Sequence, residues 1–242
     1  MMYLNERIDD LQRGGLRVIQ RADAFRFGTD AVLLADFAAP RRHDRVCDLG
    51  TGTGIIPLLL YARENTISAD AVEIQPDMAD MAARSMAMNG LNEKIRVLPG
   101  DLRSIRTLLP HARYDLVTCN PPYGKAGGTL LNPDASKRLA RHEESCAIED
   151  VACAAAWLLQ NGGRLCCVFP APRMIELSDA MRKYRMAPKR IRMVHSRVEK
   201  AAHLCLMEGM LDARPGLIIE PPLVIYDENN AYTPELRRIY GL

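Results

Sequence analysis

The chain has 242 residues, of which 48% are hydrophobic and 26% charged, an ordinary globular composition that argues against a disordered protein. Its formal net charge is only +2, so the molecule as a whole is not strongly basic, and no apolar run approaches the roughly 20 residues that a membrane span needs. The charged N-terminal stretch does not resemble a signal peptide, and the seven cysteines form no CxxC pair. We therefore expect a cytoplasmic protein without a structural metal or a membrane anchor.

Short apolar runs alternate with helical patterns from residue 45 onward, which is typical of an α/β fold with a mostly parallel sheet. We expect five parallel strands, then two strands that pair as an antiparallel hairpin. The predicted strands are 45–50, 69–74, 94–100, 114–120, 164–169, 189–195 and 203–211. The predicted helices are 55–63, 76–89, 148–160 and 172–184, and Asn161-Gly162-Gly163 should end the third of them.

Two segments flank this predicted core of residues 45–211. Residues 1–44 include an amphipathic-looking helical stretch at 29–38. Residues 212–242 are rich in Pro and Asn, so we expect a strand and loops at the periphery of the same domain. No linker long enough to separate two domains is present.

A local basic segment lies between Arg182 and Lys200, with eight Lys and Arg residues and a single acid, Glu199. Such a segment can bind phosphates through the release of counterions. It can equally form an ordinary solvated surface. The sequence leaves both interpretations open.

A glycine-rich turn, Asp48-Leu49-Gly50-Thr51-Gly52-Thr53-Gly54, stands between a predicted buried strand and a predicted helix. Glycines let the backbone turn sharply and approach a ligand closely, and the helix that follows offers free N–H donors. A nicotinamide fingerprint would need glycine at position 55, which is Ile55, and there is no Gly-Lys-Ser/Thr of a P-loop. The spacing instead resembles the first motif of class I methyltransferases, which hold the amino-acid end of S-adenosylmethionine over this loop. That resemblance implies a Rossmann-like, seven-stranded sheet with a C-terminal antiparallel hairpin.

Carboxylates also follow the next two predicted strands. Glu73 can accept both hydroxyls of a ribose, and we place the neighbouring Ile74 in the same cofactor site. Asp101 and Leu102 stand where the resembled family reads adenine. There the carboxylate accepts from the adenine amine and the next backbone N–H donates to the ring.

The sequence Asn120-Pro121-Pro122-Tyr123 directly follows the fourth predicted strand, at the edge where open α/β sheets bind ligands. An exocyclic amine is a poor nucleophile because its lone pair is delocalised. The side-chain oxygen of Asn120 and the carbonyl of Pro121 can accept its two N–H groups, and the fixed φ of proline helps to aim that carbonyl. Tyr123 can stack on a planar base. The same residues can also form a simple turn.

The reaction motif 120–123 and the loop 48–54 together resemble the amino-methyltransferases that act on adenine, guanine or glutamine amide. Residues 14–38 and Arg141-His142-Glu143-Glu144 narrow this to the bacterial tRNA1(Val) (adenine-37) N6-methyltransferase family, over nearly the whole chain. The resemblance implies N6-methylation of a tRNA adenine from S-adenosylmethionine, without a metal. It also implies that the segment around Phe27–Asp30 lies over the cofactor, so that residues 1–44 pack on the cofactor side.

Further site residues follow from this resemblance. Thr29 is expected on the cofactor side with Gly28 and Asp30, although Thr29 or Asp30 is equally typical of a helix N-cap. The expected substrate contacts are Tyr123, Lys125, Arg138 and Arg141, and His142 is left out of the catalytic set. The expected partner is tRNA, bound by a monomer, and the sequence does not specify which tRNA or which position is modified.

Two alternatives share the reaction motif: a glutamine-amide N5-methyltransferase of a translation release factor and an rRNA amino-methyltransferase. The release-factor enzymes carry a helical domain ahead of the core, whereas residues 1–44 have a different character. A nicotinamide-dependent oxidoreductase is disfavoured by Ile55. A non-catalytic RNA-binding module is disfavoured because the cofactor and reaction motifs are intact.

Overall fold

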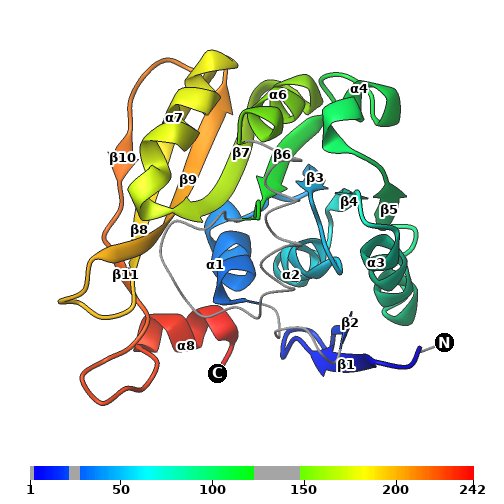
Figure 1. Ribbon diagram of the computed structural model, residues 1–242, viewed down its shortest axis with the longest axis horizontal. Coiled ribbons are helices and arrows are strands. Elements are labelled where there is room, and N and C mark those ends of the chain that lie inside the picture. Colours follow the sequence, from blue (N-terminus) through cyan, green and yellow to red (C-terminus); the bar gives the residue numbers. More distant parts are fainter. Residues whose placement is uncertain (1–2, 22–27, 123–147) are drawn as a thin grey trace, which may run out of the picture.

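A nine-stranded β-sheet forms the centre of the protein (Figure 1). The computed structural model describes residues 3–21, 28–122 and 148–242. Its sheet has the strand order β10-β8-β9-β7-β6-β3-β4-β5, and β11 also pairs with β8. The five predicted parallel strands are confirmed as β3 (Arg45–Leu49), β4 (Ser68–Glu73), β5 (Ile95–Pro99), β6 (Tyr114–Cys119) and β7 (Leu159–Pro170).

The predicted C-terminal hairpin is also present. Strand β8 (Met186–His195) pairs antiparallel with β9 (Ala202–Leu211), and β9 pairs antiparallel with β7. As a result, β8 runs in the same direction as the five parallel strands. Two short strands, β10 (Ile218–Ile219) and β11 (Leu223–Val224), extend the sheet beyond β8.

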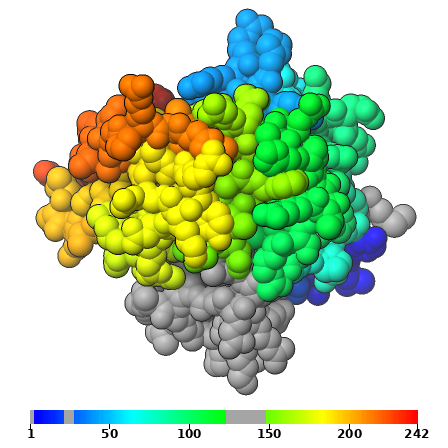
Figure 2. Space-filling model, turned by 90° about the horizontal axis from the view of Figure 1, so that it is seen from above, coloured from blue at the N-terminus to red at the C-terminus, as the bar shows by residue number. Residues whose placement is uncertain are grey.

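Helices cover both faces of the sheet and bury two separate cores. On one face lie α1 (Thr29–Ala38), α2 (Ile55–Arg63), α3 (Pro76–Met88) and α8 (Pro234–Tyr240). On the other lie α4 (Ile105–Leu108), α6 (Ile148–Leu158) and α7 (Met174–Lys183); Figure 2 shows this side, with α7 in yellow. Successive strand residues such as Val46 and Cys47 enter opposite cores, which explains the continuous apolar runs. No helix in the described ranges combines the length and the apolarity that a bilayer span requires.

The boundary between α6 and β7 differs from the prediction. The helix ends at Leu158, and β7 begins at once with Leu159, so Asn161-Gly162-Gly163 lies inside the strand rather than ending the helix. The physical reason is an irregularity in the pairing with β6. Tyr114 pairs with Leu159, but Leu116 pairs with Arg164, so the residues between them leave the ladder. Glycine suits this bulge because Gly162 has φ +77°.

The other boundaries shift by smaller amounts. The predicted helix 172–184 starts as a 3-10 turn, Ala171–Arg173, before α7 begins at Met174. Strand β8 begins at Met186, three residues before the predicted start at 189. Helix α1 has the predicted bounds but is less amphipathic than expected, because seven of its ten residues are buried. It packs between the sheet, α2 and α8, so more than one face is covered.

Three elements outside the predicted core were not anticipated. Strands β1 (Glu6–Asp10) and β2 (Arg17–Arg21) form a separate antiparallel hairpin that packs against α3. The C-terminal segment contains α8 in addition to the expected strand and loops. Figure 1 shows that the β1–β2 hairpin, α8 and the start of α1 lie on the same side of the sheet.

A buried group of charges holds the C-terminal end of α1 to the sheet. Arg164 of β7 donates to the Ala38 carbonyl (3.0 Å) and to Glu208 of β9 (3.1 Å), and both charged side chains are about 5% exposed. Arg190 of β8 donates to the Phe37 carbonyl (2.8 Å) and to the same Glu208 (3.2 Å). The last carbonyls of α1 therefore find cationic donors from two strands.

Candidate active site

The predicted site residues gather at the edge where the parallel strands end. The loop 50–54 follows β3, Glu73 ends β4, Asp101 follows β5 and Asn120 follows β6. The register pairs Leu49 with Cys119, the last residues of β3 and β6, so Gly50 and Asn120 directly follow two neighbouring strand ends. The order of strands and motifs along the sequence was therefore sufficient to predict the edge of the sheet at which these residues lie.

The glycine loop, which follows β3, has open space beside its backbone. Gly50, Gly52 and Gly54 have φ values of +69°, +58° and +84°, which side chains strongly disfavour. A Cβ at Gly50 or Gly52 would meet no described atom within 4 Å, so a ligand can approach the backbone there. A Cβ at Gly54 would lie 2.5 Å from the Met86 methyl group. Glycine at position 54 therefore suits both the left-handed backbone and the close approach of Met86 and Ala82 of α3.

Glu73 is held in a fixed position by the loop that it faces. It is only 4% exposed; Oε2 accepts from the Gly52 N–H (2.8 Å) and Oε1 from the Gln75 N–H (2.9 Å). A carboxylate oxygen can accept a second hydrogen bond. Each oxygen thus keeps capacity for one ribose hydroxyl. The neighbouring Ile74 is 45% exposed, as an apolar wall beside a ligand would be.

Asp48 carries unmet hydrogen-bonding capacity. Its side chain is fully buried, and Oδ1 accepts from the Thr118 hydroxyl (2.6 Å). Within the described residues, Asp48 Oδ2 and the Thr51 hydroxyl have no hydrogen-bond partner. Burial raises the pKa of Asp48 to about 7, against the lowering effect of the hydrogen bond from Thr118. Buried polar atoms of this kind require partners, so this end of the site fits a ligand with donor groups such as an ammonium.

Asp101 already accepts hydrogen bonds from Arg103. Its Oδ1 accepts from the Arg103 backbone N–H (2.9 Å), and the Arg103 guanidinium contacts Oδ1 at 3.1 Å and Oδ2 at 2.9 and 2.5 Å. These bonds hold the pKa of Asp101 below its usual range. An adenine amine would share this carboxylate with Arg103. Leu102 begins the 3-10 turn Leu102–Ser104 just beyond it.

The reaction motif begins directly after β6. Asn120 is half-buried, Pro121 is buried and Pro122 is exposed. The hydrogen bond from Thr118 to Asp48 ties this end of β6 to the end of β3. The sheet and this hydrogen bond therefore hold the loop 50–54 and the start of the motif 120–123 in fixed positions relative to each other. Tyr123, Lys125, Arg138, Arg141 and the segment 141–144 lie outside the described residues.

Comparison with known proteins agrees with this geometry. A family model described as the methyltransferase small domain matches residues 22–190. The chain belongs to this family. It is 34% identical over 216 residues to the tRNA1(Val) (adenine(37)-N6)-methyltransferase of Tolumonas auensis, covering 88% of this chain and 86% of the relative. It is 32% identical over 231 residues to the protein of the same name from Porphyromonas gingivalis, covering 91% and 89%.

A solved structure has the same fold as this methyltransferase. It is described as a predicted O-methyltransferase from Agrobacterium tumefaciens and has a TM-score of 0.73. The match covers 88% of this chain and 96% of that one at 24% identity. At this identity the similarity concerns the fold, which is the predicted class I methyltransferase fold.

The amino end of α1 reaches the same edge of the methyltransferase sheet. Helix α1 runs against the parallel strands, because it ends near the start of β3 and so begins near the strand ends. The N-cap is Gly28, so the alternative of a cap at Thr29 or Asp30 is wrong. The Thr29 hydroxyl instead accepts from Tyr240 (3.1 Å). Burial raises the pKa of Asp30.

The basic segment 182–200 does not form one continuous patch. Because β8 runs with the parallel strands, residues 182–185 lie at the opposite edge from Asn120, and the turn 196–201 lies on its side. Four of its cations pair with acids from elsewhere in the chain: Lys183 with Glu149, Arg185 with Asp212, Arg190 with Glu208 and Glu220, and Arg192 with Glu235. Much of the apparent excess charge is neutralised in the folded methyltransferase.

Proposed function

We propose that this methyltransferase transfers a methyl group from S-adenosylmethionine to the N6 atom of an adenine in tRNA, at position 37 of tRNA1(Val). The observation that carries the proposal is that Gly50 and Asn120 directly follow the paired ends of the neighbouring strands β3 and β6. The relatives with this activity in their names cover most of the chain. We further propose that the enzyme acts as a cytoplasmic monomer, in which 1–44 and 212–242 pack on the core 45–211 as parts of one domain.

The residues of the site fit the cofactor along its whole length. The unpartnered Asp48 Oδ2 suits its ammonium, and the open backbone at Gly50 and Gly52 admits its amino-acid end. Glu73 has capacity for two ribose hydroxyls, and Asp101 with Leu102 would meet the adenine. When bound, S-adenosylmethionine supplies a methyl group on a sulfonium, which is a good leaving group. Thr51, Gly54, Ile74 and Thr29 complete the proposed cofactor set.

The residues of the protein itself orient the target amine. The Asn120 side-chain oxygen and the Pro121 carbonyl accept the two N–H groups of the target amine and hold its lone pair toward the methyl group. Pro122 restricts the backbone behind this pair, and Tyr123 stacks on the base. The adenine must leave its stack to reach this position, and Lys125, Arg138 and Arg141 would bind the surrounding phosphates. Positioning of this kind can account for most of the rate enhancement without a strong base.

Nucleoside mass spectrometry tests the proposal directly. Purified enzyme, S-adenosylmethionine and unmodified tRNA1(Val) should yield N6-methyladenosine, and an oligonucleotide digest should place it at position 37. A matched tRNA with guanine at that position should remain unmethylated. Methylation of a release-factor glutamine or of rRNA, with no product on tRNA, would refute the proposed substrate.

A further inference from the structure

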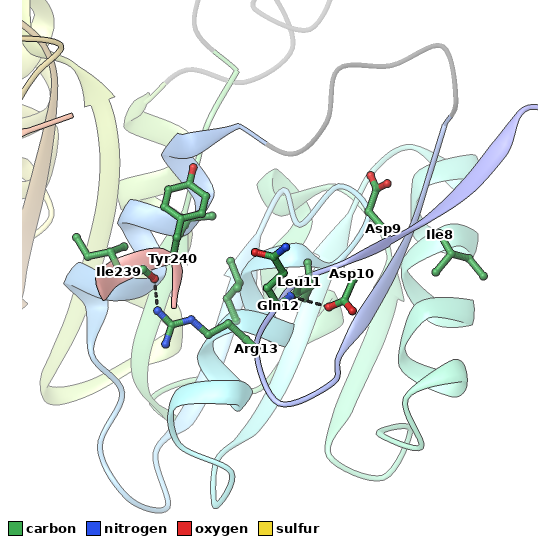
Figure 3. A pocket seen from close by; sticks show the side chains of 10 residues that line it. Ile8, Asp9, Asp10, Leu11, Gln12, Arg13, Ile239 and Tyr240 are labelled. Carbon is green, nitrogen blue, oxygen red and sulfur yellow. Dashed lines mark hydrogen bonds between the residues drawn. The ribbon is translucent and has the colours of Figure 1, made fainter. Parts of the chain in front are cut away.

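The last helix, α8, is fixed at both ends. At its start, the Arg192 guanidinium donates to both oxygens of Glu235 (2.8 Å each). At its end, the Arg13 guanidinium donates to the carbonyls of Arg238 (2.8 Å) and Ile239. Figure 3 shows Arg13 of the β1–β2 turn reaching the Ile239 carbonyl. The position of α8 therefore does not depend on the hydroxyl group of its final residue, Tyr240.

The Tyr240 ring is held by a stack of tyrosines. It lies 5.6 Å from the Tyr232 ring at 15°, and Tyr232 lies 5.5 Å from Tyr226 at 28°. On another side, Tyr240 lines a cavity of about 430 Å³ between α8 and the β1–β2 turn (Figure 3). The hydroxyl of this ring donates a hydrogen bond to Thr29. Removing the hydroxyl alone would therefore remove this one contact and leave the ring in its stack.

Thr29 is the first residue of α1, whose amino end has no side-chain cap. A helix amino end carries partial positive charge and unpaired N–H groups, so it favours an anion. The carboxylate is the anionic group of S-adenosylmethionine. Helix α1 begins at the sheet edge that holds the loop 50–54, where we place the amino-acid end of the cofactor. We therefore expect the carboxylate to lie at the start of α1.

We propose that Tyr240 is a positioning residue that aims the Thr29 hydroxyl at the carboxylate of S-adenosylmethionine; this inference rests on the proposed function. A hydroxyl has one hydrogen to donate and two lone pairs. Since Tyr240 donates to Thr29 Oγ1, the Thr29 hydrogen points away from Tyr240 and is free to meet an acceptor at the sheet edge. A hydroxyl that accepts one hydrogen bond also donates a stronger one.

The test compares two ligands that differ only in the amino-acid end. S-adenosylhomocysteine has the carboxylate and 5′-methylthioadenosine lacks it, and isothermal titration calorimetry gives both dissociation constants. Tyr240→Phe keeps the ring and the stack, so we expect a roughly five- to tenfold weaker affinity for S-adenosylhomocysteine. The affinity for 5′-methylthioadenosine should stay the same. Tyr232→Phe, which removes the hydroxyl of the next ring, is the matched control and should change neither affinity.

A double-mutant cycle separates positioning from general support. Thr29→Val should weaken S-adenosylhomocysteine binding, Thr29→Ser should retain it, and Tyr240→Phe should add no further loss in the Thr29→Val background. Equal losses for both ligands, additive losses, or no loss in Tyr240→Phe would each overturn the inference and leave the proposed function intact. If the wild-type protein bound neither ligand, the proposed function itself would fail.

Discussion

Replacing Glu73 by alanine removes two acceptors from the centre of the proposed cofactor site. Both carboxylate oxygens are anchored by backbone N–H groups, one of them that of Gly52 in the glycine loop. A hydrogen bond to a charged group contributes about 1.5–3 kcal/mol. Two lost ribose contacts therefore cost at least about 3 kcal/mol, which corresponds to a roughly 100-fold higher dissociation constant.

Isothermal titration calorimetry with S-adenosylhomocysteine measures this effect directly. Glu73→Gln is the matched variant: it keeps the size of the side chain but loses one acceptor, so its loss should lie between those of wild type and Glu73→Ala. Circular dichroism must first show that both variants fold. A dissociation constant within about twofold of wild type in folded Glu73→Ala would refute the ribose role.

Three further perturbations test separate parts of the structure. Asn120→Ala should leave S-adenosylhomocysteine affinity unchanged and lower the single-turnover methylation rate at least about 100-fold, because an acceptor that orients the amine is lost; near-normal turnover would contradict the reaction model. Arg164→Met should lower the free energy of unfolding by about 3 kcal/mol in urea, because the buried Glu208 loses its buried cation and keeps only the half-buried Arg190; an unchanged midpoint would show that Arg190 alone is sufficient. The pKa of Asp48 is raised to about 7, so the folded protein keeps a proton that the unfolded chain releases near pH 4. Stability of the ligand-free protein should therefore fall as pH rises from about 4 to 7, by up to roughly 4 kcal/mol, and Asp48→Asn should flatten that decline; identical pH profiles would exclude Asp48 as its source.

The parallel core was predictable because each of its strands is a short apolar run buried on both faces. Strand β3 and helix α2 have bounds within one residue of those predicted. The end of α6 was not predictable from Gly162-Gly163, because only the pairing with β6 shows that these residues belong to a strand bulge. Helix α8 had a local signal that was overlooked: Thr233 caps it and Pro234 follows as its first residue.

The candidate site was also predictable only in part. Strand order was enough to place Glu73, Asp101 and Asn120 at one edge, because parallel strands end together. Their hydrogen bonds were not predictable, since Thr118 to Asp48 and Tyr240 to Thr29 join residues 70 and 211 positions apart. For the same reason, the sequence could not decide between the two interpretations of the basic segment 182–200. Its acidic partners come from other elements and meet it only in the folded chain.

The bond between Arg13 and the end of α8 links residues 225 positions apart in the chain. Contacts of such long range form late in folding, because a long loop must close before they can contribute. During synthesis, α8 can join the first hairpin and α1 only after residues 234–240 have left the ribosome. A nascent chain that stops before α8 therefore lacks the hydrogen bond from Tyr240 to Thr29, and we expect it to bind the cofactor more weakly.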